Sequence, residues 1–215
     1  MKYKVMQKIF NILSNTLSLL LYPLLIPTYG MSLYMASMSI QLPELPVAYI
    51  RLSIFGTFIA TAIIPILFIF LLRKLGIISS LKIENHKERT VPYIYTTVCF
   101  GFWCYFVSQT LQMPVVWLVI AIASTCALFF VSIINYWWKI SAHLTALGGF
   151  LGGICSLSLY YSILPITLII CILIISLLLM YARIYLKAHT SAQVVCGYLL
   201  GFICTFVPNL IIYHA

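Results

Sequence analysis

Long apolar stretches alternate with short polar segments along the whole chain. About 20 consecutive apolar residues let an α-helix cross the hydrocarbon core of a bilayer, where the helix satisfies its own backbone polar groups. The pattern predicts seven such helices, over residues 9–37, 48–72, 91–110, 114–134, 140–161, 164–182 and 190–212. Pro23 and Pro27 are expected to kink the first. We therefore expect an all-α, polytopic transmembrane helix bundle of six to seven spans, forming a single integral membrane domain over residues 1–215.

The composition agrees with a membrane protein. Of 215 residues, 64% are hydrophobic and 7% are charged, whereas soluble domains have roughly 25% charged residues. The weakly alternating ten-residue strands of a membrane β-barrel do not occur. The formal charge is +9, but the basic residues are spread over loop ends, so nucleic acid is not an expected partner.

The cysteines and acidic residues limit the kinds of disulfide and metal site that the chain can form. All seven cysteines lie in apolar stretches without a CxxC pair, which is typical of small buried hydrophobic residues rather than disulfides or a metal site. The chain has no Asp, and its only acids are Glu44, Glu84 and Glu88. Since the metal ions that assist phosphoryl transfer are held by carboxylates, we expect neither a metal site nor a cofactor.

Three polar segments interrupt the apolar pattern at residues 82–89, 141–143 and 183–189, and we call them the polar islands. Two predicted spans separate each consecutive pair, so all three islands should emerge at the same membrane face. Lys and Arg are concentrated on that side, with Arg51 alone on the other, and the positive-inside rule places the crowded side in the cytoplasm. The basic segment behind Met1 lacks a clear small-residue cleavage site, which predicts a retained helix rather than a signal peptide.

The first two islands carry groups that suit an anion. If residues 82–89 are helical, Lys82 and Arg89 lie two turns apart on nearly one face, where Arg offers a planar fork of donors and Lys a point charge. A solvated charged loop is the alternative. In the second island, Ser141 precedes His143, an imidazole at the head of a span, where an ionisable group needs a partner or a function. An interfacial anchor is the alternative there.

The third island has the most specific spacing. Arg183 and His189 are six residues apart, so the chain must break between the last two spans to turn both toward one point. His189 and Gln193 are four residues apart and therefore stack on one face of the last helix. Gln193 could then accept a hydrogen bond from the far ring nitrogen of His189 and fix its tautomer.

In order and spacing, the islands resemble the motifs of the type 2 phosphatidic acid phosphatase family. The family pattern is Lys-x6-Arg-Pro, then Pro-Ser-Gly-His, then Ser-Arg-x5-His-x3-Asp. The corresponding residues here are Lys82-x6-Arg89, Ser141-Ala-His143 and Arg183-x5-His189-x3-Gln193. The resemblance covers a core of about residues 80–205. The chain departs from the pattern at Thr90, Ala142, Ala182 and, most importantly, at Gln193 in place of Asp.

The resemblance implies a role for each of these residues. His189 would be the nucleophile that forms a phosphohistidine, His143 the general acid that protonates the leaving oxygen, and Gln193 the group that orients His189. Lys82, Arg89, Ser141 and Arg183 would bind the phosphoryl oxygens. Phosphoryl transfer needs positioning and charge stabilisation, which cations can supply without metal.

The resemblance implies a bacterial inner-membrane lipid phosphatase. Its substrate would be an isoprenoid or glycerolipid phosphate, such as undecaprenyl pyrophosphate, phosphatidylglycerophosphate, phosphatidate or a lipid A phosphate. Many bacterial family members face the periplasm, which is the alternative to the cytoplasmic face favoured by the charge count. Two other functions stay open: a non-catalytic relative that binds or translocates anionic lipids, and a transporter or assembly subunit. Membrane lipids are the expected partners, and the sequence predicts no oligomeric state.

Overall fold

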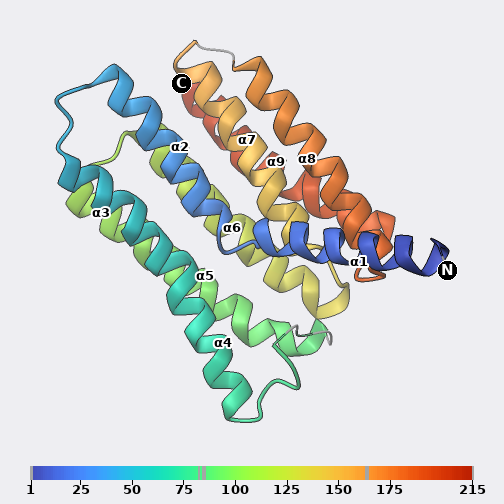
Figure 1. Ribbon diagram of the computed structural model, residues 1–215. Coiled ribbons are helices and arrows are strands. Elements are labelled where there is room, and N and C mark those ends of the chain that lie inside the picture. Colours follow the sequence, from blue (N-terminus) through green and yellow to red (C-terminus); the bar gives the residue numbers. More distant parts are fainter. Residues whose placement is uncertain (1, 82, 84–85, 163–164, 215) are drawn as a thin grey trace.

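The computed structural model describes residues 2–81, 83, 86–162 and 165–214, and within them the chain folds into helices joined by short loops (Figure 1). The α-helices are α1 (Lys2–Leu20), α2 (Ile26–Gln41), α3 (Val47–Phe58), α4 (Ile64–Lys74), α5 (Thr90–Phe106), α6 (Val115–Trp137), α7 (Ala142–Tyr160), α8 (Ile166–Tyr185) and α9 (Ser191–His214). Two π-helical turns, Ile59–Ile63 and Val107–Leu111, and a 3₁₀ turn, His86–Arg89, extend these helices.

Six helices among the described residues are long and apolar enough to cross a membrane: Val47–Lys74, Lys87–Leu111, Val115–Trp137, Ala142–Tyr160, Ile166–Tyr185 and Ser191–Tyr213. The protein is therefore a multi-pass membrane protein with an all-α bundle, as the sequence predicts. The ends of these six spans lie within four residues of the predicted ends. The π-helical turn Ile59–Ile63 lies directly before Pro65, which cannot donate a hydrogen bond within the helix.

The first predicted span, 9–37, is wrong as a single helix. The chain breaks between Leu20 and Ile26, and α1 and α2 run in different directions on either side of the break (Figure 1). Pro23 explains the break, because proline has no N–H and disfavours a helical conformation in the residue before it. Pro27 lies in the first turn of α2, where proline is tolerated.

Helix α1 is amphipathic and lies across one end of the bundle (Figure 1). Its apolar side chains, including Val5, Ile9 and Ile12, are exposed, and so are Lys4 and Lys8. Ser14 and Ser18 are buried against the bundle. An exposed apolar face beside a basic polar face is typical of a helix in the membrane interface, which explains why α1 is not a span.

Helices α7 and α9 form the tightest pair in the bundle. A β-carbon at Gly148 would collide with the backbone of Tyr198, and one at Gly201 would collide with the backbone of Thr145. Small residues allow helix backbones in a membrane to approach closely. The backbone N–H of Ser141, just before α7, also donates to the carbonyl of Gln193 in α9 at 3.3 Å. This contact ties the second polar island to the third.

Candidate functional site

The described parts of the three polar islands lie at the same end of the bundle, which we call the basic end. Here α4, α6 and α8 end, α5, α7 and α9 begin, and α1 lies across the ends of α7 and α8 (Figure 1). The charges of Arg89, Arg183 and His189 are all close enough to act on His143. The structure therefore brings one or more residues of each island together, as the spacing of the spans predicts. Lys82, the remaining predicted phosphate ligand, lies outside the described residues.

The chain break that brings Arg183 and His189 together lies at the end of α8. The N–H of Ala188 donates to the carbonyl of Arg183 at 3.1 Å, and the N–H of Lys187 donates to the carbonyl of Ile184 at 2.9 Å. Lys187 has a left-handed backbone, with φ of 52°. This pattern ends a helix and reverses the chain. As a result, His189 folds back beneath the end of α8 instead of continuing its direction.

His189 is held by hydrogen bonds through one ring nitrogen. Its Nδ1 lies 3.1 Å from the carbonyl oxygen of Lys139 and 3.3 Å from Oε1 of Gln193. Both partners are acceptors, so Nδ1 carries the proton and Nε2 keeps its lone pair. The hydrogen bond to Gln193 is the one that the four-residue spacing predicts. The second acceptor is a backbone carbonyl, which no sequence motif marks.

The ring of His189 is 7% exposed, and its surroundings keep it neutral. Burial, reinforced by the positive charges of Arg183 and Arg89, lowers the pKa of His189 from 6.5 to about 4. At neutral pH the imidazole is therefore uncharged and nucleophilic at Nε2. Cations that surround a neutral nucleophile are arranged to attract an anionic reactant.

Gln193 also begins α9. Its Oε1 accepts the N–H of Thr190 at 3.1 Å, and its own N–H donates to Oγ1 of Thr190 at 3.4 Å. This reciprocal pair is a capping box, which satisfies backbone donors that a helix start leaves unpaired. The Thr-x-x-Gln spacing of residues 190–193 is a sequence pattern from which this capping box could have been predicted. Gln193 thus fixes both the helix start and the adjacent imidazole.

His143 is held by the last turn of α1 and by the linker that follows it. Its Nε2 lies 3.1 Å from the carbonyl oxygen of Ser18, and the ring of Tyr22 meets it edge-on, with centroids 5.7 Å apart. Since a carbonyl only accepts, Nε2 carries the proton and Nδ1 is the nitrogen that can gain or lose one. The sequence pattern did not associate residues 18–22 with the site.

Three polar atoms around His143 and Arg183 are buried without a hydrogen-bond partner among the described residues, namely Nε of Arg183, Oγ of Ser141 and Oγ of Ser18. Ser141 is completely buried and immediately precedes α7, yet its hydroxyl does not cap that helix. Unsatisfied buried polar groups are costly, and a helix start and an Arg side chain both attract anions. These atoms indicate a binding position for an anion with several oxygen atoms.

Arg89 and two tyrosines complete this cluster. Nε of Arg89 donates to the carbonyl of Ile83 at 2.7 Å, which orients the guanidinium. Arg89, Tyr93 and Tyr22 all lie close enough to Arg183 to interact with its guanidinium. Burial is the main reason that the pKa of Tyr22 is raised, so its hydroxyl remains a neutral hydrogen-bonding group.

The site has a strongly positive character. The charged side chains that act on His189 are those of Arg183, Arg89 and Lys139, all of them cations. In the neighbouring loop, Oε2 of Glu88 accepts from N and Oγ of Ser79, at 2.7 and 2.9 Å. Within the described part of the chain, no group of three or more His, Cys, Asp or Glu residues could hold a metal ion.

Comparisons of the chain with family models, with curated proteins and with solved structures found no match.

Proposed function

We propose that the protein is a membrane lipid phosphatase in which His189 attacks a phosphoryl group bound by Arg89, Arg183 and Ser141. One observation carries the proposal: His189 is a buried, neutral imidazole whose Nδ1 proton is shared between two acceptors and whose Nε2 lone pair has no partner among the described residues. Beside it, two guanidinium groups provide the charge that phosphoryl transfer requires.

The first step transfers the phosphoryl group to the enzyme. The lone pair of His189 Nε2 forms a bond to phosphorus while the bond between phosphorus and the lipid oxygen breaks, and the electron pair of that bond leaves with the oxygen. The resulting phosphohistidine carries its remaining proton on Nδ1. The carbonyl of Lys139 and Oε1 of Gln193 stabilise this cationic ring, because both already accept from Nδ1.

His143 is suited to move the proton in both steps. With Nε2–H held on the Ser18 carbonyl, Nδ1 takes up a proton when the anionic phosphate binds and donates it to the departing lipid oxygen. The same nitrogen then accepts a proton from water as the water oxygen attacks phosphorus and breaks the bond to His189 Nε2. Inorganic phosphate leaves together with that proton, and both imidazoles return to their starting states.

The position of the site supports a lipid substrate. It lies at the end of a bundle of apolar spans, directly under the amphipathic α1, so a phosphate head group at the membrane interface can reach Arg183. Isoprenoid and glycerolipid phosphates, the undecaprenyl pyrophosphate, phosphatidylglycerophosphate and phosphatidate classes among them, are therefore the substrates that we propose.

A second candidate is a protein that binds or translocates anionic lipids without hydrolysing them. Gln193 favours this alternative, because a neutral amide stabilises a cationic phosphohistidine less than a carboxylate does. The same Arg89 and Arg183 would bind the head group. The two candidates differ in whether phosphate becomes attached to His189.

The test is phosphate release by the purified full-length protein in detergent, with a chelator present, from a panel of these lipid phosphates. We expect release by the wild type and by Lys187→Gln, whose exposed side chain lies outside the cluster, and background rates from His189→Asn. Binding of lipid phosphate without release from any substrate would support the second candidate. Equal release by the wild type and His189→Asn would refute the role of His189.

A further inference from the structure

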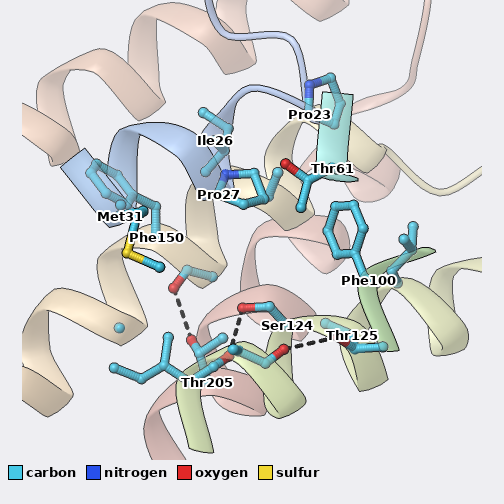
Figure 2. Close-up of a pocket in the computed structure, with 18 of the residues that line it drawn as sticks. Pro23, Ile26, Pro27, Met31, Thr61, Phe100, Ser124, Thr125, Phe150 and Thr205 are labelled. Atoms are coloured by element: carbon cyan, nitrogen blue, oxygen red, sulfur yellow. Dashed lines mark hydrogen bonds between the residues drawn. The ribbon is translucent and has the colours of Figure 1, made fainter. Parts of the chain in front are cut away.

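An elongated cavity extends from the basic end into the bundle. It has a volume of about 150 Å³ and is lined by α2, α5, α6, α7, α9 and the π-helical turn Ile59–Ile63. Figure 2 shows Pro23, Pro27 and Thr61 on one wall and Ser124, Thr125 and Thr205 on another. Along α7 the lining extends from Ala142 to Leu157, which is about 22 Å at the helical rise of about 1.5 Å per residue.

One end of the cavity is lined by sequence neighbours of the proposed phosphate site. Ala142, at one end of the lining, lies between Ser141 and His143. Pro23, also in the lining, follows Tyr22, whose ring contacts His143. A molecule that occupies this end of the cavity is therefore within one residue of the groups proposed to bind and protonate a phosphate ester.

The cavity wall suits an apolar occupant. Most of its lining side chains are hydrophobic, and each of its Ser and Thr hydroxyls donates to a backbone carbonyl. Thr61, for example, donates to the carbonyl of Thr57 at 2.8 Å, and Thr125 donates to that of Ala121 at 2.9 Å. These hydroxyls have no proton left to offer a polar ligand, and the hydroxyl of Tyr34 is the lining group that lacks a partner among the described residues, so most of the wall favours a hydrocarbon.

We propose that this cavity binds a single hydrocarbon chain of a lipid whose phosphate head group lies at Arg89 and Arg183. The inference rests on the proposed function and narrows the substrate class. A small volume spread over such a length accommodates one chain at a time, which favours an isoprenoid or other single-chain phosphate over a lipid that must bury two acyl chains. The positive charges of Arg183 and Arg89 around His189 favour an anionic head group over a neutral one.

Binding of n-alkyl phosphonates of increasing length tests the proposal without requiring turnover. In the wild-type protein, we expect affinity to rise by up to about fourfold per methylene group until the chain fills the cavity, and then to level off. Ala121→Leu, which places a larger side chain in the cavity wall, should reduce this gain while leaving the shortest phosphonate unaffected. Ala36→Leu makes the same change at an exposed position of α2 and should leave the gain unchanged.

Two further measurements separate the contribution of the phosphonate head group to binding from that of the hydrocarbon chain. Arg183→Gln should weaken the binding of every phosphonate by a similar factor, and the corresponding alcohols should bind more weakly than the phosphonates. Alcohols that bind as tightly as phosphonates would overturn the proposal in favour of a neutral occupant. If Ala121→Leu does not fold, Ala146→Leu fills the opposite wall on α7 and is expected to give the same result.

Trp103 and Trp117 line the cavity and report directly on its occupant. In a Trp137→Phe, Trp138→Phe background, a phosphonate with bromine at the end of its chain should quench the remaining tryptophan emission. Absent quenching, or an identical dependence on chain length in Ala121→Leu and the wild type, would overturn the cavity proposal. Quenching by a protein that releases no phosphate would instead refute the enzymatic proposal and leave the cavity site standing.

Discussion

Replacing Arg183 with Gln removes one of the two described guanidinium groups from the site, and two measurable effects should follow. Arg183 acts on the phosphoryl group through its guanidinium, whose Nε has no partner among the described residues. It also acts on His189, where its charge is the strongest influence on the pKa after burial. The first effect concerns the rate, and the second concerns the pH at which activity is lost.

The rate effect can be estimated from similar electrostatic groups. Removing one preorganised donor that stabilises transition-state charge costs about 10²–10³ in kcat, or roughly 3–4 kcal/mol. Protonation of the nucleophile cannot account for such a loss. Even if the pKa of His189 rose from about 4 to the ordinary 6.5, about three quarters of the imidazole would remain neutral at pH 7. A large fall in rate at pH 7 therefore measures lost phosphate stabilisation.

The assay is kcat/KM between pH 4 and pH 8 for the purified proteins. In the wild type, kcat/KM should fall at acid pH with a midpoint near pH 4. In Arg183→Gln this midpoint should move toward pH 6.5, because the positive charge beside His189 is lost. Arg183→Lys should give an intermediate rate, because it keeps the positive charge but loses the planar set of guanidinium N–H donors. Lys187→Gln should match the wild type in both respects.

An Arg183→Gln protein with a rate at pH 7 within twofold of the wild type would refute the proposed clamp. An unchanged acid limb combined with a large loss of rate would show that Arg183 binds phosphate without controlling His189. Misfolding is excluded by the thermal midpoint in detergent, which should not fall. Arg183 lies beside the like charge of Arg89, so its removal relieves repulsion in the unliganded protein.

Three further predictions concern the surroundings of His189. Gln193→Glu keeps the capping box and places a carboxylate on His189, so activity and the pKa of His189 should both rise; a lower rate would mean that the site requires the neutral amide. Because the pKa of His189 is lower in the folded protein than the ordinary 6.5, stability should be lost as the pH falls from about 6.5 to about 4, by up to about 3 kcal/mol; His189→Asn should lack this loss, and an equal dependence of the two melting temperatures on pH would contradict the interpretation. Gly201→Ala should lower stability by about 1–3 kcal/mol because the added methyl group forces α9 from α7, whereas Gly101→Ala, where nothing lies within 4 Å, should be tolerated; equal melting temperatures would contradict the close packing.

The spans were predictable because continuous apolar runs are a strong signal for transmembrane helices. Two spans separate each pair of consecutive islands, and this even number was enough to predict that the islands lie at the same end of the bundle. The prediction of one span over residues 9–37 was wrong because α1 and α2 are both largely apolar. From the sequence alone, Pro23 indicated a kink within one helix rather than a break between two. The amphipathic repeat of Lys4, Lys8, Asn11 and Asn15 was the signal for an interfacial helix.

The candidate site was partly predictable for a similar reason. The four-residue spacing of His189 and Gln193 predicts a hydrogen bond that the structure contains. His189 precedes α9, however, and the capping box of Thr190 and Gln193, rather than stacking on a helix face, brings the two side chains together. The carbonyls of Ser18 and Lys139, which hold the two imidazoles, could not be predicted, since every residue has a carbonyl and only the tertiary fold selects one. The cavity likewise depends on how side chains from several helices fill the space between them.

The most direct test of the central claim is to trap the enzyme with a lipid phosphate labelled with ³²P, quench it within one turnover, and locate the label by mass spectrometry under alkaline conditions that preserve phosphohistidine. The account predicts label on His189, none in His189→Asn, and more label in His143→Ala with a substrate whose leaving group needs no proton. Phosphate release by the wild type without label on His189, or with label on another residue, would contradict it.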